Sequence, residues 1–139
     1  MAESAKDAIA KEPQLLCGDA VVRDEAGRAV LLGGRCADCG AMAFPRAPVC
    51  TGCMGENILP EPMPRPGTLY AFSTVYIAPR RWHTPMTIGY VDLPNGVRVF
   101  AHLAGDGFSI GDSVEPDIGI VGKDDAGPIA CFVFKRVKS

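Results

Sequence analysis

The sequence predicts a mainly β protein in which a rubredoxin-like zinc ribbon is followed by a five-stranded OB-fold barrel. Two C-x-x-C pairs, Cys36–Cys39 and Cys50–Cys53, lie ten residues apart, a spacing typical of a four-cysteine metal site. Beyond Gly67, five short stretches with a period of two are rich in aromatic and β-branched residues, without a helical stretch between them. That pattern favours a small closed barrel.

Composition sets limits on the function. The chain has 139 residues, of which 47% are hydrophobic, and a formal net charge of −2. This length suits one small domain with a metal-stabilised module too short to bury a core of its own. No hydrophobic run approaches the roughly 18 residues of a membrane helix, so we expect no membrane span. The lack of a basic surplus argues against a protein that mainly grips nucleic acid.

Residues 1–16 are expected to form an N-terminal tail or a short helix. Ala5, Ala8 and Ile9 would share one side of that helix, and Pro13 would end it. The segment is charged and alanine-rich and lacks the apolar core of a signal peptide. Together with a zinc site, this start predicts a protein of the reducing cytoplasm.

Residues 17–58 are predicted to contain a β-hairpin and the zinc ribbon. Two short apolar stretches, 20–22 and 29–32, flank a turn at Asp24–Gly27, which is the pattern of a hairpin. This hairpin leads directly into the first cysteine pair.

The four paired cysteines are the predicted metal ligands: Cys36, Cys39, Cys50 and Cys53. Each pair directs two thiolates toward one point, and four thiolates complete the coordination of zinc. No position stays open for water or substrate, so the zinc is predicted to be structural and not hydrolytic. Two disulfides, or iron bound by the same four thiolates, are the alternatives.

Residues 59–66 contain four prolines in eight positions. Each proline fixes its own backbone and restricts the residue before it, so we expect an extended, semi-rigid spacer.

Residues 67–139 are predicted to form the barrel. Its five strands are expected at residues 68–77, 86–93, 97–103, 114–121 and 129–134. Pro94-Asn95-Gly96 predicts a tight turn that joins the second and third strands as a hairpin. The first strand has apolar residues on both alternating faces, with Leu69 on one and Tyr70 on the other. Its outer face should therefore be covered by the zinc ribbon, a partner, or both.

The chain offers no recognisable catalytic group of its own. Cys131 lies in an apolar run and is predicted to be a buried, inert thiol, while Cys17 has no histidine near it in sequence. His83 is expected at the surface, and His102 is expected to contact neighbours across a sheet. No nucleophile elbow, zinc-protease motif or phosphate-binding loop is present, which argues against an enzyme that acts alone.

The connection between the first two barrel strands holds a candidate binding site, Arg80, Arg81 and Trp82. In this class of barrel, such loops carry ligands. Tryptophan and arginine dominate the energetics of protein interfaces, which favours a partner contact. The same residues could hold the phosphates and adenine of coenzyme A, or form a solvated turn whose tryptophan caps the barrel end.

Several segments together resemble a known family. The stretch 31–40 with its first cysteine pair, then Phe44-Pro45-Arg46 and the second pair, then 67–73 at the start of a barrel, resemble the zinc-ribbon/OB-fold proteins of acyl-CoA metabolism, formerly a domain of unknown function. The resemblance covers roughly residues 30–137. It implies zinc on the four cysteines and a small subunit that binds a thiolase-fold enzyme, with the catalytic cysteine in that partner.

Two functions follow. In the first, the chain is an accessory subunit of a thiolase-type complex that processes a β-ketoacyl-CoA, with coenzyme A thioester as the substrate of the complex and one small subunit for each protomer of a dimeric partner. In the second, it binds single-stranded nucleic acid, as many zinc-ribbon and barrel proteins do. A strand binder needs a basic groove with exposed stacking residues. The predicted second half of the barrel is instead acidic, so we expect no nucleic-acid partner. Its acidic residues are Asp106, Asp112, Glu115, Asp117, Asp124 and Asp125.

Overall fold

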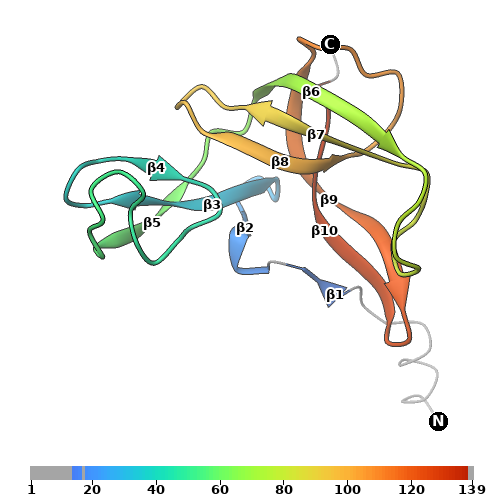
Figure 1. The fold of residues 1–139 in the computed structure, drawn as a ribbon, viewed down its shortest axis with the longest axis horizontal. Helices are drawn as coiled ribbons and strands as arrows, with labels where there is room; N and C mark the ends of the chain where they lie inside the picture. The colour runs from blue at the N-terminus through green and yellow to red at the C-terminus, as the bar shows by residue number, and fades with distance from the viewer. Residues whose placement is uncertain (1–13, 17, 138–139) are drawn as a thin grey trace.

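The structure is a computed structural model that describes residues 14–16 and 18–137. Its strands are β1 Gln14–Leu15, β2 Val21–Arg23, β3 Ala29–Cys36, β4 Met42–Ala43, β5 Ile58–Pro62, β6 Gly67–Val75, β7 Met86–Asp92, β8 Arg98–Leu103, β9 Ser113–Asp124 and β10 Gly127–Arg136. A short 3-10 helix, η1, covers Gly18–Ala20. Figure 1 shows the zinc-ribbon strands beside one end of a barrel. Across the described residues, no helix is long and apolar enough to cross a membrane.

Strands β6 to β10 form the predicted five-stranded barrel. β6, β7 and β8 pair as an antiparallel meander, and β8 continues the sheet by a parallel pairing with β10. β10 pairs with β9, and β9 returns to β6 at Gly67–Thr68, which closes the barrel. The expected fold class and the five barrel strands are therefore confirmed.

The first barrel strand does not alternate as strictly as predicted. A β-bulge between Leu69 and Ala71 shifts its register against β7, so that Ala71 pairs with Tyr90 and Phe72 with Gly89. A bulge adds one residue to one strand and reverses the faces that follow it. Ile77, expected inside the strand on the face of Leu69, lies beyond it and is 92% exposed.

The hairpin and the zinc ribbon share strand β3. Its first half pairs with β2, as the predicted hairpin requires. Its second half pairs with β4 on one side and with β5 on the other. One continuous strand thus runs from the hairpin to the first metal ligand, Cys36.

The proline-rich segment is more than a spacer. Its first residues belong to β5, which pairs with β3 in register from Leu32↔Pro62 to Cys36↔Ile58. Proline is tolerated here because β5 is an edge strand, where a missing N–H need not break a ladder. The division of the chain at residues 58 and 66 stays a prediction.

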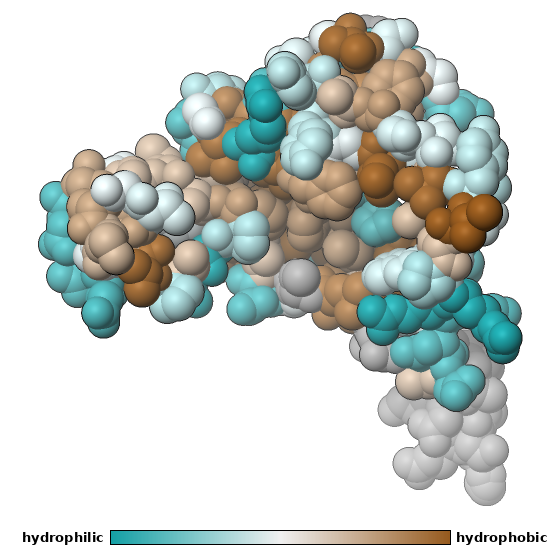
Figure 2. Space-filling view, in the orientation of Figure 1, coloured by the Kyte–Doolittle hydropathy of each residue, from teal (hydrophilic) through white to brown (hydrophobic). Residues whose placement is uncertain are grey.

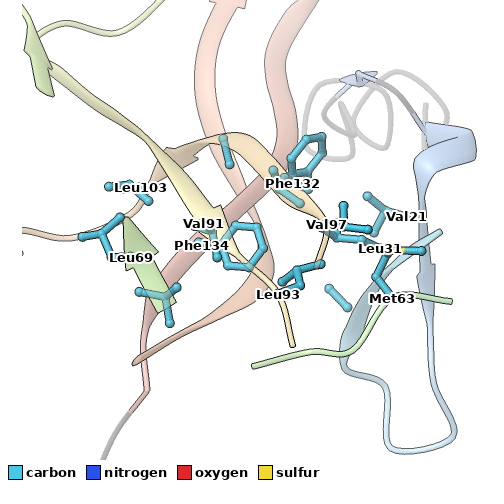
Figure 3. Close-up of a cluster of buried hydrophobic side chains, with 14 residues drawn as sticks. Val21, Leu31, Met63, Leu69, Val91, Leu93, Val97, Leu103, Phe132 and Phe134 are labelled. Atoms are coloured by element: carbon cyan, nitrogen blue, oxygen red, sulfur yellow. The ribbon is translucent and has the colours of Figure 1, made fainter. Parts of the chain in front are cut away.

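A single core joins the hairpin to the barrel. Val21 and Leu31 from the hairpin and Met63 from the spacer pack with the barrel residues in one buried cluster. Figure 3 shows these three side chains facing the β7–β8 turn, where Leu93 and Val97 lie. The ring of Phe44, from the ribbon, also contacts that of Phe132 edge-on, with centroids 5.3 Å apart. The ribbon is therefore fixed to the barrel by apolar contacts.

The N-terminal segment differs from the expectation where it is described. Gln14 and Leu15, expected in a tail or helix, form strand β1 and pair in parallel with Ile129 and Ala130 of β10. Leu16 packs against a second, smaller core cluster formed by Val121, Ile129 and Val133. Pairing and packing with residues distant in sequence, which the local pattern does not reveal, thus order residues 14–16 against the barrel. The expected helix residues 1–13 and Cys17 lie outside the described residues.

Candidate functional site

The structure brings the four predicted metal ligands together. The sulfurs of Cys36, Cys39, Cys50 and Cys53 all lie within 4.8 Å of one another. The Sγ atoms of Cys36 and Cys53 are 3.6 Å apart, as are those of Cys39 and Cys50. Tetrahedral zinc with Zn–S bonds near 2.3 Å requires sulfur separations of about 3.8 Å, whereas a disulfide requires about 2.0 Å. The arrangement therefore fits a four-thiolate metal and not two disulfides.

The backbone around the second pair directs N–H groups at one sulfur. The N–H groups of Gly52 and Cys53 donate to Cys50 Sγ at 3.3 and 3.5 Å. Gly55 lies so close that a Cβ there would be 2.6 Å from Asp38 Oδ2 and 3.2 Å from Cys53 Sγ. This close approach explains why a glycine follows the second pair at position 55.

The pKa values of two of the four thiols shift in opposite directions. The N–H groups of Cys53 and Gly52 lower the pKa of Cys50 to about 6. At Cys53, a backbone N–H from Gly55 acts to lower the pKa, but the three neighbouring sulfurs and burial outweigh it and raise that pKa to about 12. Four thiolates therefore need a cation between them. All four can then act as ligands, which leaves no position open for catalysis.

The predicted binding loop lies at the other end of the molecule, between β6 and β7, and runs back along β9 (Figure 1). Trp82 forms an isolated β-bridge with Gly122 of β9. Arg81 O accepts from the Lys123 N–H at 2.8 Å, and the His83 N–H donates to Val121 O at 2.9 Å. A Cβ on Gly122 would overlap Arg81 O, so glycine is what allows this close approach.

Trp82 itself is half-buried. It packs against the second core cluster, and its ring lies 5.8 Å from that of His102. The Arg81 guanidinium lies over the Trp82 ring at 4.9 Å. Trp82 therefore contributes packing at the barrel end. Of the three predicted binding residues, Arg80 and Arg81 are exposed.

The two arginines join charged residues that are distant in sequence. Arg80, Arg81 and Lys123 line an open hollow of about 320 Å³ together with Asp124 and Asp125. The side chain of Asp124 accepts the Ala126 N–H within the β9–β10 turn. Figure 2 shows hydrophilic residues gathered at this hairpin tip. Three positively charged side chains and two carboxylates thus line the hollow.

The structure also places the two histidines and the cysteine that the sequence analysis considered. His83 is exposed, as predicted, and His102 pairs across the sheet with Ile88. Burial lowers the pKa of His102. Cys131 is half-buried, less so than expected, and packs against both core clusters.

Sequence reasoning expected an apolar outer face at Tyr70 but missed the aromatic residues that β7 and β8 add to it. Tyr70, Tyr90 and Phe100 are 50%, 45% and 55% exposed. The Tyr90 and Phe100 rings contact at 5.3 Å, and the Arg98 guanidinium lies 3.7 Å above the Tyr70 ring. Arg98 also forms an ion pair with Asp92 at 2.6 Å. Counting outward from the three-residue Pro94-Asn95-Gly96 turn pairs residue 90 with residue 100, so the sequence did contain this signal.

This outer face is continuous with the binding loop. Tyr90 pairs with Phe100, and one step further Ile88 pairs with His102. His102 in turn contacts Trp82. We call the surface formed by Tyr70, Tyr90 and Phe100 the aromatic face.

Comparisons with known proteins match both halves of the chain. Residues 23–58 match the rubredoxin-like zinc ribbon domain of ChsH2, and residues 60–118 match the C-terminal OB-fold domain of ChsH2. A solved structure described as the Ltp2-ChsH2(DUF35) aldolase has the same fold, with a TM-score of 0.61 at 22% identity over 77% of this chain and 84% of that chain.

Characterised relatives are more similar in sequence. The benzoylsuccinyl-CoA thiolase subunit BbsA of Thauera aromatica is 38% identical over 80% of this chain and 80% of its own. Its namesake from Geobacter metallireducens is 36% identical over 84% of this chain and 81% of its own. A DUF35 domain-containing scaffold protein of Methanocaldococcus jannaschii is 29% identical over 55% of this chain and 56% of its own. This chain therefore belongs to the ChsH2 family of proteins that carry a rubredoxin-like zinc ribbon and an OB-fold domain.

Proposed function

We propose that the chain is an accessory, non-catalytic subunit of a thiolase-type enzyme. The complex would transfer an acyl group or cleave a carbon–carbon bond by thiolysis in a β-ketoacyl-CoA, as in the breakdown of fatty acids, steroids or aromatic compounds. Its support is the family membership and the thiolase subunits that match four-fifths of this chain. A thiolase-fold partner would supply the reactive cysteine.

The observation that carries this proposal is the open aromatic face. The ribbon does not cover it, since Tyr70, Tyr90 and Phe100 each keep 45% or more of their surface. Of the two covers that the sequence suggested for the outer barrel face, a partner remains. Exposed tyrosine and phenylalanine beside an arginine have the composition of interface hot spots.

Zinc has a structural part in this proposal. Bound by Cys36, Cys39, Cys50 and Cys53, it would hold the ribbon that packs on the barrel through Phe44. The reduced thiols suit the cytoplasm.

The loop residues Arg80, Arg81 and Trp82 would meet the partner or the coenzyme A of the complex. His102 connects this loop to the aromatic face. One partner could therefore contact both surfaces at once. A thiolase-type dimer would bind one small subunit per protomer, because a symmetric partner offers two equivalent sites.

The test is co-expression with the candidate thiolase-fold subunit, followed by gel filtration and thiolysis assays. We expect a stable complex, activity only when both chains are present, and none from this chain alone. A Phe100→Ala chain should bind the partner roughly thirtyfold more weakly, whereas the matched control Leu59→Ala should bind normally, since Leu59 is 44% exposed but lies in β5 of the ribbon. Full activity of the partner without this chain would refute the proposal.

Binding of single-stranded nucleic acid is the second candidate, and the aromatic face favours it because exposed rings can stack on bases. The charge opposes it, since Arg98 beside that face is already paired with Asp92. We expect affinity for a labelled oligonucleotide no better than the non-specific range of about 0.1 mM at physiological salt. A micromolar, steeply salt-dependent complex in fluorescence anisotropy would reverse the ranking.

A further inference from the structure

The two histidines of the described chain line one cavity. It has a volume of about 320 Å³ and lies between the β6–β7 loop and the barrel wall where β8, β9 and β10 meet. His83, His102 and Thr87 are its polar residues, and Leu103, Val121 and Val133 are among its apolar ones. Its size is at the lower end of the range of about 300–1,000 Å³ for small-molecule sites. We call it the histidine slot.

The slot is held open by a fixed wall. The β6–β7 loop is attached to β9 on both sides of Trp82, through Arg81 O and the His83 N–H, and lies against Gly122 without room for a side chain. A site built on such a backbone is formed before a ligand arrives, which lowers the cost of binding.

His102 determines which ligand chemistry suits the interior. Within residues 18–137, the structure records no hydrogen bond or ion pair to its imidazole nitrogens, and its ring is occupied on one side by Trp82. Burial lowers its pKa, so the ring is neutral near pH 7 and offers one donor and one acceptor. Such a group pairs with amides and carbonyls and does not by itself balance an anion.

Positive charge lies just outside the slot. Along the loop, Arg81 and Arg80 precede His83, and along β9 Lys123 follows Val121, so the hollow of the two arginines and Lys123 adjoins the slot. Asp124 and Asp125 in that hollow leave one net positive charge there. Guanidinium groups suit phosphate or carboxylate groups.

We propose that the histidine slot binds an elongated, uncharged chain bearing amide or thioester carbonyl groups, and that the anionic end of the same ligand lies on Arg80, Arg81 and Lys123. The acyl-pantetheine arm of a coenzyme A thioester and a free acyl carboxylic acid share part of this chemistry. The first has the uncharged amides that the slot suits, so it is the ligand to which we commit. This choice rests on the proposed function, but the binding test does not.

The test uses the isolated full-length chain, because its single tryptophan and its two histidines are direct reporters. S-acetylpantetheine, coenzyme A, adenosine 3′,5′-bisphosphate and hexanoate are titrated in turn, and the imidazole resonances and Trp82 emission are followed. We expect S-acetylpantetheine to shift the His102 resonances, and coenzyme A to bind at least tenfold more tightly. The bisphosphate alone should leave His102 unchanged.

Variants separate the two parts of the site. Ala104 is exposed and lines the slot, so Ala104→Phe should fill it without disturbing the core and weaken both pantetheine ligands at least tenfold. Ala26→Phe, an equally exposed change in the β2–β3 turn, is the matched control and should bind as the unaltered chain does. The double variant Arg80→Gln with Arg81→Gln should reduce the affinity for coenzyme A to that for S-acetylpantetheine. It should leave the affinity for S-acetylpantetheine unchanged.

Three results would overturn the inference. These are the absence of any shift with millimolar S-acetylpantetheine, equal binding by the Ala104→Phe chain, or the same shifts with hexanoate alone. Loss of the complex with a thiolase-fold subunit would refute the proposed function and leave this binding result standing. Normal assembly with that subunit, but no binding of S-acetylpantetheine, would refute this inference and leave the proposed function standing.

Discussion

Arg65 donates a hydrogen bond to Glu115 Oε1 at 2.9 Å, and this pair connects the proline-rich segment to strand β9. The same guanidinium donates to Ala29 O of the hairpin and to Pro116 O, each at 3.0 Å. The side chains of Arg65 and Glu115 are only 16% and 25% exposed. One arginine thus joins the hairpin, the spacer and the barrel.

Replacing this arginine should destabilise the whole protein. Arg65→Met would leave two carbonyls and a carboxylate without their donor, at a cost of about 2–3 kcal/mol of unfolding free energy. The measurement is urea denaturation followed by Trp82 fluorescence. Arg98→Met is the matched control, because the Arg98–Asp92 pair is 47% and 41% exposed and should contribute no more than about 1 kcal/mol. Equal losses in both variants would contradict the assigned role of Arg65.

Removing the metal should unfold the ribbon. Binding free energy in small zinc modules is also folding free energy, and Cys36 is almost completely buried. We expect one zinc per chain by elemental analysis, loss of the ribbon on chelation, and an insoluble or partly unfolded Cys36→Ser chain. A red iron spectrum, or normal folding of Cys36→Ser, would be incompatible with structural zinc.

Gly122 should be required for the order of the β6–β7 loop. A Cβ there would overlap Arg81 O, so Gly122→Ala should displace the loop and expose Trp82, shifting its emission to longer wavelength. Gly18→Ala is the control, because its Cβ would meet Leu15 at an ordinary 3.6 Å. If Trp82 emission does not change in Gly122→Ala, the loop does not depend on this contact.

The sequence predicts a contact well when the two residues are close along the chain, and poorly when they are far apart along it. The cysteine pairs and the Asn95-Gly96 turn are local signals, and both the four-sulfur cluster and the β7–β8 hairpin follow from them. The pairing of β5 with β3 and of Gln14 with Ile129 could not be predicted, because each depends on contacts between distant segments. The Gly122–Trp82 bridge is of the same kind.

Stability should depend on the protonation of His102. Burial lowers its pKa below the ordinary 6.5, so the unfolded chain binds more protons in the window between the folded pKa and 6.5. The free energy of unfolding should therefore rise with pH through that window and fall as the solution becomes more acid. Denaturation between about pH 5 and pH 8 measures this slope. His102→Gln should flatten it, and an unchanged slope in that variant would contradict the assignment.

The aromatic face and the arginine loop should contribute differently to assembly with a thiolase-fold subunit. Tyr90→Ala or Phe100→Ala should weaken the complex by about 2 kcal/mol, roughly thirtyfold, because buried aromatic residues carry most of the binding energy at interfaces. Arg80→Gln and Arg81→Gln should act on the association rate and its salt dependence if they meet the partner. If they meet coenzyme A instead, they should raise KM while the complex stays intact.

Trp82→Ala would test the binding loop less clearly than the arginine variants, because it should also affect folding. Trp82 packs against the second core cluster and His102, so its loss should lower stability as well as any binding. Assembly by gel filtration, association kinetics at two salt concentrations and turnover on one set of variants would assign each surface. Unaltered assembly and kinetics in all the aromatic and arginine variants would exclude both surfaces from the interface. The aromatic face is assigned on its 45–55% exposure, and the loop on its exposed arginines.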